Sequence, residues 1–471
     1  ISTLVLARVL TPADFGLVAM AMVVVAFTEL MSAFGFDSAL IQRQDAGRAH
    51  YDTAWTFNLI FGAGAALVLF ALALPMARFY SDERLVAVLA VLACGSFIGG
   101  FENIGVVAFR KELDFRSEFR FLAGKRIAGF VVTVSLALAL HSYWALVAGT
   151  VTGRAMSVWI SYRLHPYRPR PSLAARADLM HFSRWIFFSS LITFVSSRST
   201  DFVLGRTVGA AGLGVYSVSY QIAMMPSTEL IAPLNRAVYP AYARLAADLP
   251  ALRTRFLEVF GVICLVAIPV SAGLFGAADA AVRVVLGTNW LAAVPMIRIF
   301  GICGLVGALQ GNMYLTNVAV GKPQANTTLS ATLVLVTLPV IVWSSLHYGV
   351  VGAGYALLFE ALASLTGIIV INRRNTGLLA GSLLGVAWRP VVGSAVMVAV
   401  MMALDAMLVA RLPGLAQLLR LLALTGAGAL TYIAVVYVTW RAVGAPRGAE
   451  SLVLGLARHR AMAWWARKHP A

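Results

Sequence analysis

Residues 143–163 read YWALVAGTVTGRAMSVWISYR, and residues 164–184 read LHPYRPRPSLAARADLMHFSR. The first stretch is apolar over the roughly 20 residues that an α-helix needs to cross a bilayer. The second stretch is polar and rich in arginine and proline. Because long apolar runs and short basic connections alternate in this way along the whole chain, the sequence predicts a helical membrane protein.

The overall composition agrees with this interpretation. The chain has 471 residues, of which 60% are hydrophobic and 12% are charged, and its mean hydropathy is +0.83. These values exclude an ordinary soluble domain. The net charge of +17 could suit a nucleic acid, but the cations lie in short loops beside apolar runs. We therefore expect membrane lipids as partners and no nucleic acid.

The apolar runs predict an all-α protein with about 14 transmembrane helices. Runs of spanning length lie at 15–41, 54–76, 85–108, 119–140, 143–163, 182–204, 212–235, 256–282, 292–317, 325–346, 350–371, 388–410 and 415–440. A further run at 1–10 is only about half as long as a span requires. Since the chain begins with Ile1, we expect this first helix to be truncated.

The basic residues predict the orientation of the chain. The connections on one side hold most of the cations, including Arg48, Arg110, Arg170, Arg244, Arg374 and the arginines of the tail. The connections on the other side hold only Arg8, Arg78, Arg84, Arg206, Arg283 and Arg411. Because short loops rich in Lys and Arg stay in the cytoplasm, we predict that the C-terminus is cytoplasmic.

A weak internal repeat divides the chain. RVLTPADFGL at 8–17 resembles RTVGAAGLGV at 206–215, and each precedes a span containing Thr-Glu-Leu, at 28–30 and at 228–230. Both copies are predicted to cross the membrane in the same direction, so the repeat is parallel. A parallel repeat predicts two pseudo-symmetric six-helix bundles. The predicted parts are an N-terminal bundle at 1–164, a basic cytoplasmic linker at 165–181, a C-terminal bundle at 182–372, two further helices at 388–440 and a basic amphipathic tail at 441–471.

Two arginines lie deep inside predicted spans. A charge at the bilayer centre costs about 2.5–3.5 kcal/mol on insertion scales, so it must face protein or water. Arg154, at the middle of 143–163, either faces an aqueous cavity that receives an anion or pairs with a carboxylate on a neighbouring helix. Arg198 and Asp201 share one helix face and either act on a substrate or neutralise each other.

Acidic side chains in the spans are candidates for ion coupling or gating. A carboxylate inside a membrane protein can exchange a proton with an aqueous lumen, or it can be the static partner of an arginine. Glu29 and Glu229 occupy equivalent places in the repeat and are therefore the first candidates. Glu102, Glu360 and Asp201 are the others.

Amide side chains and missing motifs further limit the functional class of this membrane protein. Several amides could line a sugar-accepting path, although hydrogen bonding between helices is their commoner use: Asn103, Gln221, Asn235, Gln310, Asn312 and Asn317. The sequence has no glycine-rich phosphate loop followed by Lys-Ser/Thr and no HExxH motif. We therefore expect a protein that is not an enzyme, with no metal and no cofactor, driven by a proton or sodium gradient.

Several segments also resemble a known family. LARVLTPADFGLVAMA at 6–21 and GFDSALIQR at 35–43 resemble the opening of bacterial Wzx-type oligosaccharide flippases, the polysaccharide-transporter family, as do DFVLGR at 201–206 and LGVYS at 213–217. The resemblance implies the fold of the multidrug/oligosaccharidyl-lipid/polysaccharide exporter superfamily, with two six-helix bundles facing each other in a V and two further helices. It also implies a role in lipopolysaccharide or exopolysaccharide biosynthesis in the bacterial inner membrane.

The implied substrate is an oligosaccharide on an undecaprenyl pyrophosphate carrier, moved from the cytoplasmic to the periplasmic leaflet. A diphosphate needs cations in the lumen, and we assign that role to Arg154 and Arg198. Association with a polysaccharide polymerase is a further expectation. A drug/cation antiporter of the same superfamily is the nearest alternative, and a membrane-embedded polymerase or glycosyltransferase is a more distant one.

Overall fold

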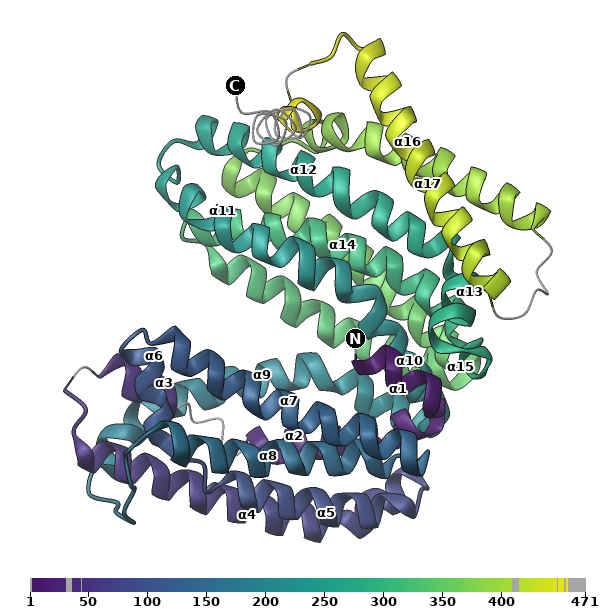
Figure 1. Cartoon of the computed structure of the whole chain (residues 1–471). Helices are drawn as coiled ribbons and strands as arrows, with labels where there is room; N and C mark the ends of the chain where they lie inside the picture. Colours follow the sequence, from purple (N-terminus) through teal and green to yellow (C-terminus); the bar gives the residue numbers. More distant parts are fainter. Residues whose placement is uncertain are drawn as a thin grey trace, which may run out of the picture. The chain divides into compact units, whose positions relative to one another are not determined.

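The computed structural model describes residues 2–30, 36–43, 45–408, 415–446, 448–452 and 455, and these residues form helices and turns without any strand. The chain divides into two compact units, Ile1–Ser217 and Val218–Ala471. Figure 1 shows the helices of each unit packed side by side. The helix after the predicted linker, α9 (Arg176–Thr207), packs against helices of the first unit.

The first unit is a helical bundle (Figure 1). Besides α9, it contains α1 (Ser2–Val9), α2 (Pro12–Leu30), α3 (Phe36–Gln42), α4 (Arg48–Tyr80), α5 (Arg84–Gly99), η1 (Ile104–Val106), α6 (Val107–Lys111), α7 (Phe115–Leu140), α8 (Trp144–Leu164) and the beginning of α10 (Gly209–Met225). Helix α8 packs against both α7 and α5, and α2 packs against α9, α5 and α4. These contacts bring α2, α5 and α8 together in one bundle.

One predicted span of this unit is a broken helix. The span predicted at 85–108 consists of α5 followed by the short η1–α6 pair, and the two parts are bent by 68°. Gly99 and Gly100 precede the break, and the backbone of Phe101 and Glu102 leaves the helix there in tight turns. Broken helices occur in membranes only where protein or a cavity satisfies the freed backbone groups.

The second unit is also helical (Figure 1). Its elements are η2 (Pro226–Ile231), α11 (Ala232–Arg244), α12 (Leu249–Gly276), α13 (Ala278–Ala281), η3 (Val282–Leu286), η4 (Thr288–Trp290), α14 (Ala293–Ala319), α15 (Pro323–Thr376), α16 (Ala380–Met407) and α17 (Leu415–Ala442). Helix α15 is interrupted at Gly349, whose φ of 62° and ψ of −147° are not helical. It therefore corresponds to the two spans predicted at 325–346 and 350–371.

The two copies of the repeat motif touch each other. A Cβ atom on Gly16 would lie 1.6 Å from the carbonyl oxygen of Ala210, and a Cβ atom on Gly214 would lie 1.8 Å from that of Pro12. These distances are far below any van der Waals contact, so both positions require glycine. The matched glycines of the two motifs thus allow the starts of α2 and α10 to pack backbone against backbone.

Apart from short breaks such as residues 100–103, the predicted spans are helical in the described residues. Eight helices are long and apolar enough to cross a membrane, or nine if α5 and η1–α6 form one span. The protein is therefore a multi-pass membrane protein, and the predicted number of fourteen spans is consistent with this structure. Most of the predicted amphipathic tail at 441–471 lies outside the described residues.

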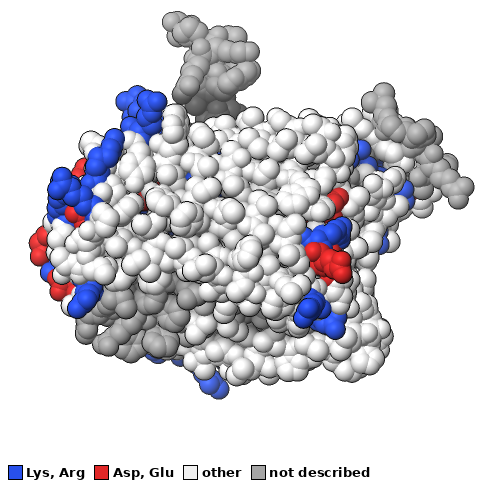
Figure 2. Space-filling view, turned by 90° about the horizontal axis from the view of Figure 1, so that it is seen from below, with Lys and Arg blue, Asp and Glu red and all other residues white. Residues whose placement is uncertain are grey.

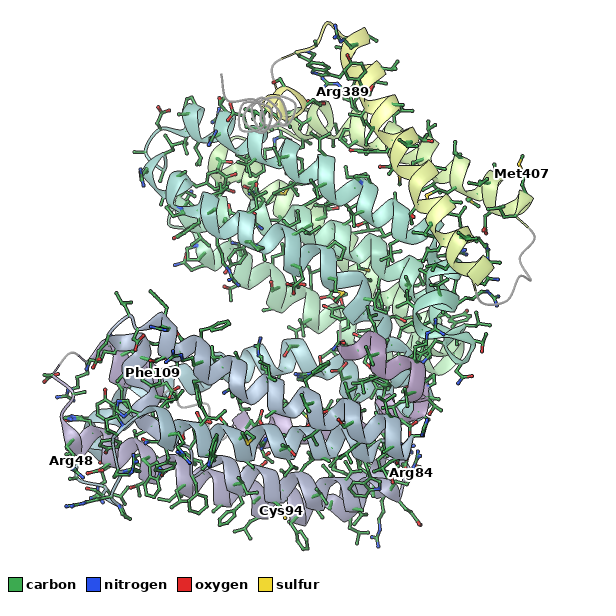
Figure 3. The ribbon with its side chains drawn as sticks, viewed as in Figure 1. Arg48, Arg84, Cys94, Phe109, Arg389 and Met407 are labelled. Carbon is green, nitrogen blue, oxygen red and sulfur yellow. The ribbon has the colours of Figure 1, made fainter. Side chains whose placement is uncertain are left out.

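The first unit has charged ends and an uncharged middle. Seen from the side of α4 and α5, a broad band of uncharged residues separates two charged margins (Figure 2). Figure 3 places Arg48 and Arg84 at opposite ends of these helices, with Cys94 between them. This distribution is the one expected of a bundle whose middle lies in hydrocarbon.

Candidate functional site

A row of polar side chains runs along α8 in the first unit. Arg154, Ser157 and Ser161 follow one another at spacings of three and four residues, which places them on one face of the helix. Each residue binds a different part of the bundle. We call these three residues and their hydrogen-bond partners the α8 polar row.

Arg154 is held by two helices at the middle of α8. Its Nη2 donates a hydrogen bond to Oε1 of Glu29 on α2 at 2.5 Å, and its Nη1 donates to Oγ of Ser96 on α5 at 2.6 Å. The side chain of Arg154 is 20% exposed, whereas that of Glu29 is 54% exposed. Of the two alternatives for Arg154, the structure therefore contains the ion pair, with Glu29 as its more accessible member.

Two glycines of α5 make room for this arginine. A Cβ atom on Gly95 would lie 3.5 Å from Cδ of Arg154 and only 3.1 Å from the side chain of Val151, and a Cβ atom on Gly99 would lie 3.9 Å from Cδ of Arg154. The aliphatic stem of Arg154 therefore lies against α5 where α5 has no side chains. The spacing of small residues allows this close approach between helices.

Glu102 occupies the break between α5 and η1. The hydroxyl of Ser157, one turn along α8 from Arg154, donates a hydrogen bond to Oε2 of Glu102. Glu29 and Glu102 thus bind neighbouring members of the same row. The structure brings together three predicted site residues, Arg154, Glu29 and Glu102.

The row continues to the end of the unit that contains Arg48. The backbone N–H of Asn103 donates to Oγ of Ser161 at 3.0 Å, and Nδ2 of Asn103 donates to the carbonyl of Tyr167 at 2.7 Å. The hydroxyl of Tyr167 donates to Oδ1 of Asp52 at 2.5 Å. Burial raises the pKa of Tyr167 above its ordinary value, so this hydroxyl keeps its proton and remains a donor.

The beginning of the predicted linker is anchored to α4. The backbone N–H of Arg170 donates to Asp52 at 2.8 Å, and that of Ser172 donates to Oγ1 of Thr56 at 2.9 Å. Asp52 is only 7% exposed, and Arg48 lies 3.6 Å from its second carboxylate oxygen. Residues 165–175 are therefore bound to the first unit by specific hydrogen bonds.

Three basic connections meet at this same end. Arg43 forms an ion pair with Asp178 at 2.9 Å, and Arg110 forms one with Asp37 at 2.9 Å. Arg48 donates to the carbonyl of Arg168 at 3.3 Å. The Arg43 guanidinium lowers the pKa of Asp178 below its ordinary value. Basic connections that are far apart in the sequence thus lie at one end of the first unit, as expected if basic and poorly charged loops alternate between the two sides of the membrane.

Arg198 and Asp201 form a local pair on α9. Their side chains are 3.4 Å apart, and those side chains are 44% and 18% exposed, respectively. This contact matches the alternative in which the two charges neutralise each other. Among the hydrogen bonds of the described residues, none joins the α8 polar row to Arg198 or Asp201.

Glu229 and Glu360 belong to the second unit. Glu229 is exposed in η2, a π-helical turn that begins at Pro226, and Glu360 is half-buried on α15. Neither carboxylate forms an ion pair within 4.0 Å among the residues that the structure describes. The equivalent residues of the repeat, Glu29 and Glu229, therefore have different surroundings.

The amide side chains connect helices. Asn312 on α14 donates to Asn235 on α11 at 3.2 Å and accepts from Tyr242 at 3.3 Å. Thr316 donates to Asn372 on α15 at 2.5 Å. These contacts match the interhelical alternative for the amides and form a neutral hydrogen-bonded network that joins α11, α14 and α15.

Sequence reasoning missed several members of these networks. Ser96 and Ser157 are single serines in apolar runs, and only the spacing of Ser157 from Arg154 could have indicated its place. In the second unit, Arg420 is 6% exposed and binds both carboxylate oxygens of Asp405, at 2.6 and 2.8 Å. Both residues lie in predicted spans, so this pair could have been suspected from hydropathy alone.

The continuous and broken apolar helices define a multi-pass helical membrane protein. The chain also matches, over residues 5–295, the family described as Polysaccharide biosynthesis protein. Because this match covers more than half of the chain, the protein belongs to that family.

Curated relatives agree with this assignment. The lipopolysaccharide biosynthesis protein WzxC of Escherichia coli K12 is 24% identical over 310 residues, which cover 64% of this chain and 62% of that protein. The teichuronic acid biosynthesis protein TuaB of Bacillus subtilis 168 is 27% identical over 60% of this chain and 59% of its own length. The match thus spans less than two thirds of either relative.

Solved structures confirm the fold. The lipid II flippase MurJ in an inward closed conformation has a TM-score of 0.73 at 11% identity, with 94% of this chain and 96% of that chain covered. An inward-facing multidrug resistance MATE family transporter of the MOP superfamily has a TM-score of 0.61 at 17% identity. That match covers 80% of this chain and 93% of the transporter. The predicted all-α, multi-helix membrane fold is therefore confirmed, and it resembles the folds of these two proteins.

Proposed function

We propose that this protein is a flippase that moves oligosaccharide repeat units on a polyprenyl pyrophosphate carrier from the cytoplasmic to the periplasmic leaflet of the bacterial inner membrane. The observation that carries the proposal is the ion pair between Arg154 and Glu29 in the middle of a spanning bundle. The family, its polysaccharide biosynthesis relatives and the likeness to a lipid II flippase support it.

Arg154 supplies the charge that a diphosphate needs. A guanidinium presents several N–H donors in a planar fork and binds phosphate oxygens through charge-assisted hydrogen bonds. Glu29 provides one carboxylate to this fork in the observed structure. A carboxylate and a phosphate compete for the same donors, so Glu29 holds the position of the substrate's anion while the substrate is absent.

The exchange of these two anions gives a mechanism for coupling. When Glu29 takes up a proton, its attraction to Arg154 falls and the guanidinium becomes available to the diphosphate. When Glu29 loses the proton, it competes for Arg154 and favours release. Ion coupling requires a group whose charge changes during the transport cycle, and we assign this role to the carboxylate of Glu29, which pairs with Arg154.

The remaining features of the proposal follow from topology and composition. The basic end of the first unit faces the cytoplasm, because short loops rich in arginine are retained there. The C-terminus lies on the same side, and the protein itself performs no covalent chemistry. The drug/cation antiporter alternative receives less support, because the family match and the curated relatives concern polysaccharide biosynthesis.

Reconstitution tests this function. The full chain is placed in liposomes with a fluorescent polyprenyl-diphosphate oligosaccharide, a proton or sodium gradient is imposed, and the substrate reaching the opposite leaflet is measured. We expect gradient-dependent movement that falls about tenfold or more in R154Q, because this variant removes the guanidinium that binds the diphosphate.

R198Q is the matched control, because it removes an arginine that pairs with its own helix neighbour. It should retain at least half of the wild-type rate. Movement that is unchanged in R154Q, or that is absent from the wild-type protein, would contradict the proposed function.

A further inference from the structure

We propose that a pocket of about 380 Å³ in the second unit binds the headgroup of a phospholipid that carries both a phosphodiester and a primary ammonium group, such as phosphatidylethanolamine. Its walls are α12, the beginning of α16 and the residues that follow α17. The volume lies in the range of small-ligand sites. The site is separate from the Arg154–Glu29 pair, and the proposed function does not depend on it.

Arg389 on α16 holds the phosphate in this proposal. The side chains of Arg389 and Glu450 are 12% and 10% exposed and form an ion pair. Glu450 is the only acidic residue between residues 441 and 471, a stretch that is otherwise basic. The Nε atom of Arg389 is buried and has no hydrogen-bond partner among the described residues. Because a guanidinium offers several N–H donors in one plane, Glu450 leaves donor capacity that phosphate oxygens can use.

Two carboxylates provide for the ammonium group. Glu258 on α12 lines the same pocket as Glu450. Arg255 donates to Oε2 of Glu258 at 2.8 Å, and Arg389 donates to Oε1 of Glu450. Each carboxylate has a second oxygen that accepts no hydrogen bond among those of the described residues. These four side chains carry two positive and two negative charges, and a site with separated charges of both signs suits a zwitterion better than a free phosphate ion.

Gly385 gives the headgroup its space. A Cβ atom on Gly385 would meet no atom within 4 Å among the described residues, although this glycine lines the pocket. Gly381, one turn earlier on α16, has equally open surroundings but does not line the pocket. Small residues four apart often bring two helices into close contact, and neither glycine does so in the described part of the chain. The open space beside Gly385 is therefore available to a ligand.

The pocket lies where lipid headgroups are expected. The spans predicted at 256–282 and 388–410 begin beside it, and the span predicted at 415–440 ends a few residues before Glu450. Trp388 and Trp440 stand at these boundaries, and tryptophan is enriched where membrane helices meet the headgroups. Cζ of Arg389 lies over the Trp388 ring, 5.5 Å from its centre. On the proposed orientation the lipid comes from the cytoplasmic leaflet, where basic pockets between helices bind headgroups.

Lipid titrations of the purified full-length protein, followed by native mass spectrometry, test the site. The probes are the dihexanoyl forms of phosphatidylethanolamine, phosphatidylcholine and phosphatidylglycerol, which share the phosphodiester. We expect phosphatidylethanolamine to bind roughly fivefold more tightly than the other two, because the quaternary ammonium of phosphatidylcholine has no N–H donor and phosphatidylglycerol has no ammonium group. Inorganic phosphate at the same concentration should not displace it.

G385L and G381L are a matched pair of variants. G385L places a side chain in the open space of the pocket without altering any charge, and it should weaken phosphatidylethanolamine binding about tenfold or more, because the leucine fills the volume that the headgroup needs. G381L makes the same change one turn away and should bind within about twofold of the wild type.

The charges are tested by the double variant R389Q/E450Q, which removes both members of the buried pair and therefore leaves no unpaired charge behind. It should bind phosphatidylethanolamine about tenfold more weakly than the wild type. Equal binding of the three lipids would overturn the proposed site. So would a G385L or R389Q/E450Q protein that binds phosphatidylethanolamine as tightly as the wild type.

The liposome assay separates this inference from the proposed function. A protein that moves the lipid-linked substrate but fails these binding tests rejects the headgroup site and leaves the flippase intact. A protein that binds phosphatidylethanolamine through Arg389 but moves no lipid-linked substrate supports the site and rejects the flippase.

Discussion

The repeated Thr-Glu-Leu tripeptide occurs once in each unit, and the two copies differ in their surroundings. In the first unit, Arg154 on α8 and Glu29 on α2 form an ion pair between two helices. In the second unit, Asn312, Asn235 and Tyr242 form a neutral hydrogen-bonded set. The repeated Thr-Glu-Leu tripeptide thus has a paired glutamate in one copy and, in the other, a glutamate without an ion-pair partner among the described residues.

This difference concerns charge and not backbone packing. The packing requirement is preserved, because Gly16 and Gly214 both lie against backbone that a side chain would displace. The charge pairing is not preserved, because among the described residues only the Glu29 copy has an arginine partner. We therefore assign the anionic headgroup to the first unit and a mainly structural role to the amides of the second.

The largest effect on stability is expected at the ion pair. R154A should lower the free energy of unfolding by about 2–3 kcal/mol, because it leaves Glu29 and the hydroxyl of Ser96 without their donor. A double-mutant cycle with E29Q, measured by thermal unfolding of the purified protein, should give a coupling energy of about 1–2 kcal/mol. Additive effects would show that the two side chains do not interact.

A smaller effect is expected in the neutral network of the second unit. N372A removes the acceptor of the Thr316 hydroxyl and two further hydrogen bonds to backbone carbonyls. It should destabilise the protein by roughly 1–2 kcal/mol while leaving the gradient dependence of transport unchanged. If N372A changed the gradient dependence of transport, ion coupling would involve the second unit, and the amides there would not be mainly structural.

A pH-dependent effect is expected at the basic end of the first unit. Arg43 lowers the pKa of Asp178 in the folded protein. The ionised carboxylate of Asp178 therefore stabilises the fold at pH values above its unfolded-state pKa of about 3.9. This stabilisation is lost as the pH falls through the lowered pKa of the folded state. The melting temperature of D178N should therefore lie below that of the wild type at pH 7. Near pH 2 the two melting temperatures should be equal. Equal melting temperatures at pH 7 would contradict this ion pair.

The smallest effect is expected at the exposed glutamate of the second repeat. Glu229 lies in η2 without an ion pair among the described residues, so E229Q should change the transport rate by less than about twofold. E29Q, at the equivalent place, should abolish the gradient dependence. Equal responses of the two variants in the liposome assay would show that the repeat is functionally symmetric.

The sequence predicted the spanning helices and the position of Arg154 because both follow from local hydropathy. It also named Glu29 as a candidate, because the repeat singled out that residue. It could not pair Glu29 with Arg154, since the two residues are far apart in the chain and their contact depends on the packing of α2 and α8. The hydrogen bond from Tyr167 to Asp52 also joins residues far apart in the chain, so the sequence could not predict it. The pair Gly99–Gly100 was the only local sequence signal of the helix break beside Glu102.

The central claim is that Glu29 occupies the anion-binding groups of Arg154, and binding of a soluble lipid diphosphate such as farnesyl pyrophosphate tests it most directly. With the purified full chain at neutral pH, E29Q should bind this probe more tightly than the wild type, because the competing carboxylate is gone. R154Q should bind it at least tenfold more weakly. An E29Q protein that binds the diphosphate no better than the wild type, or an R154Q protein that binds it equally well, would contradict the account.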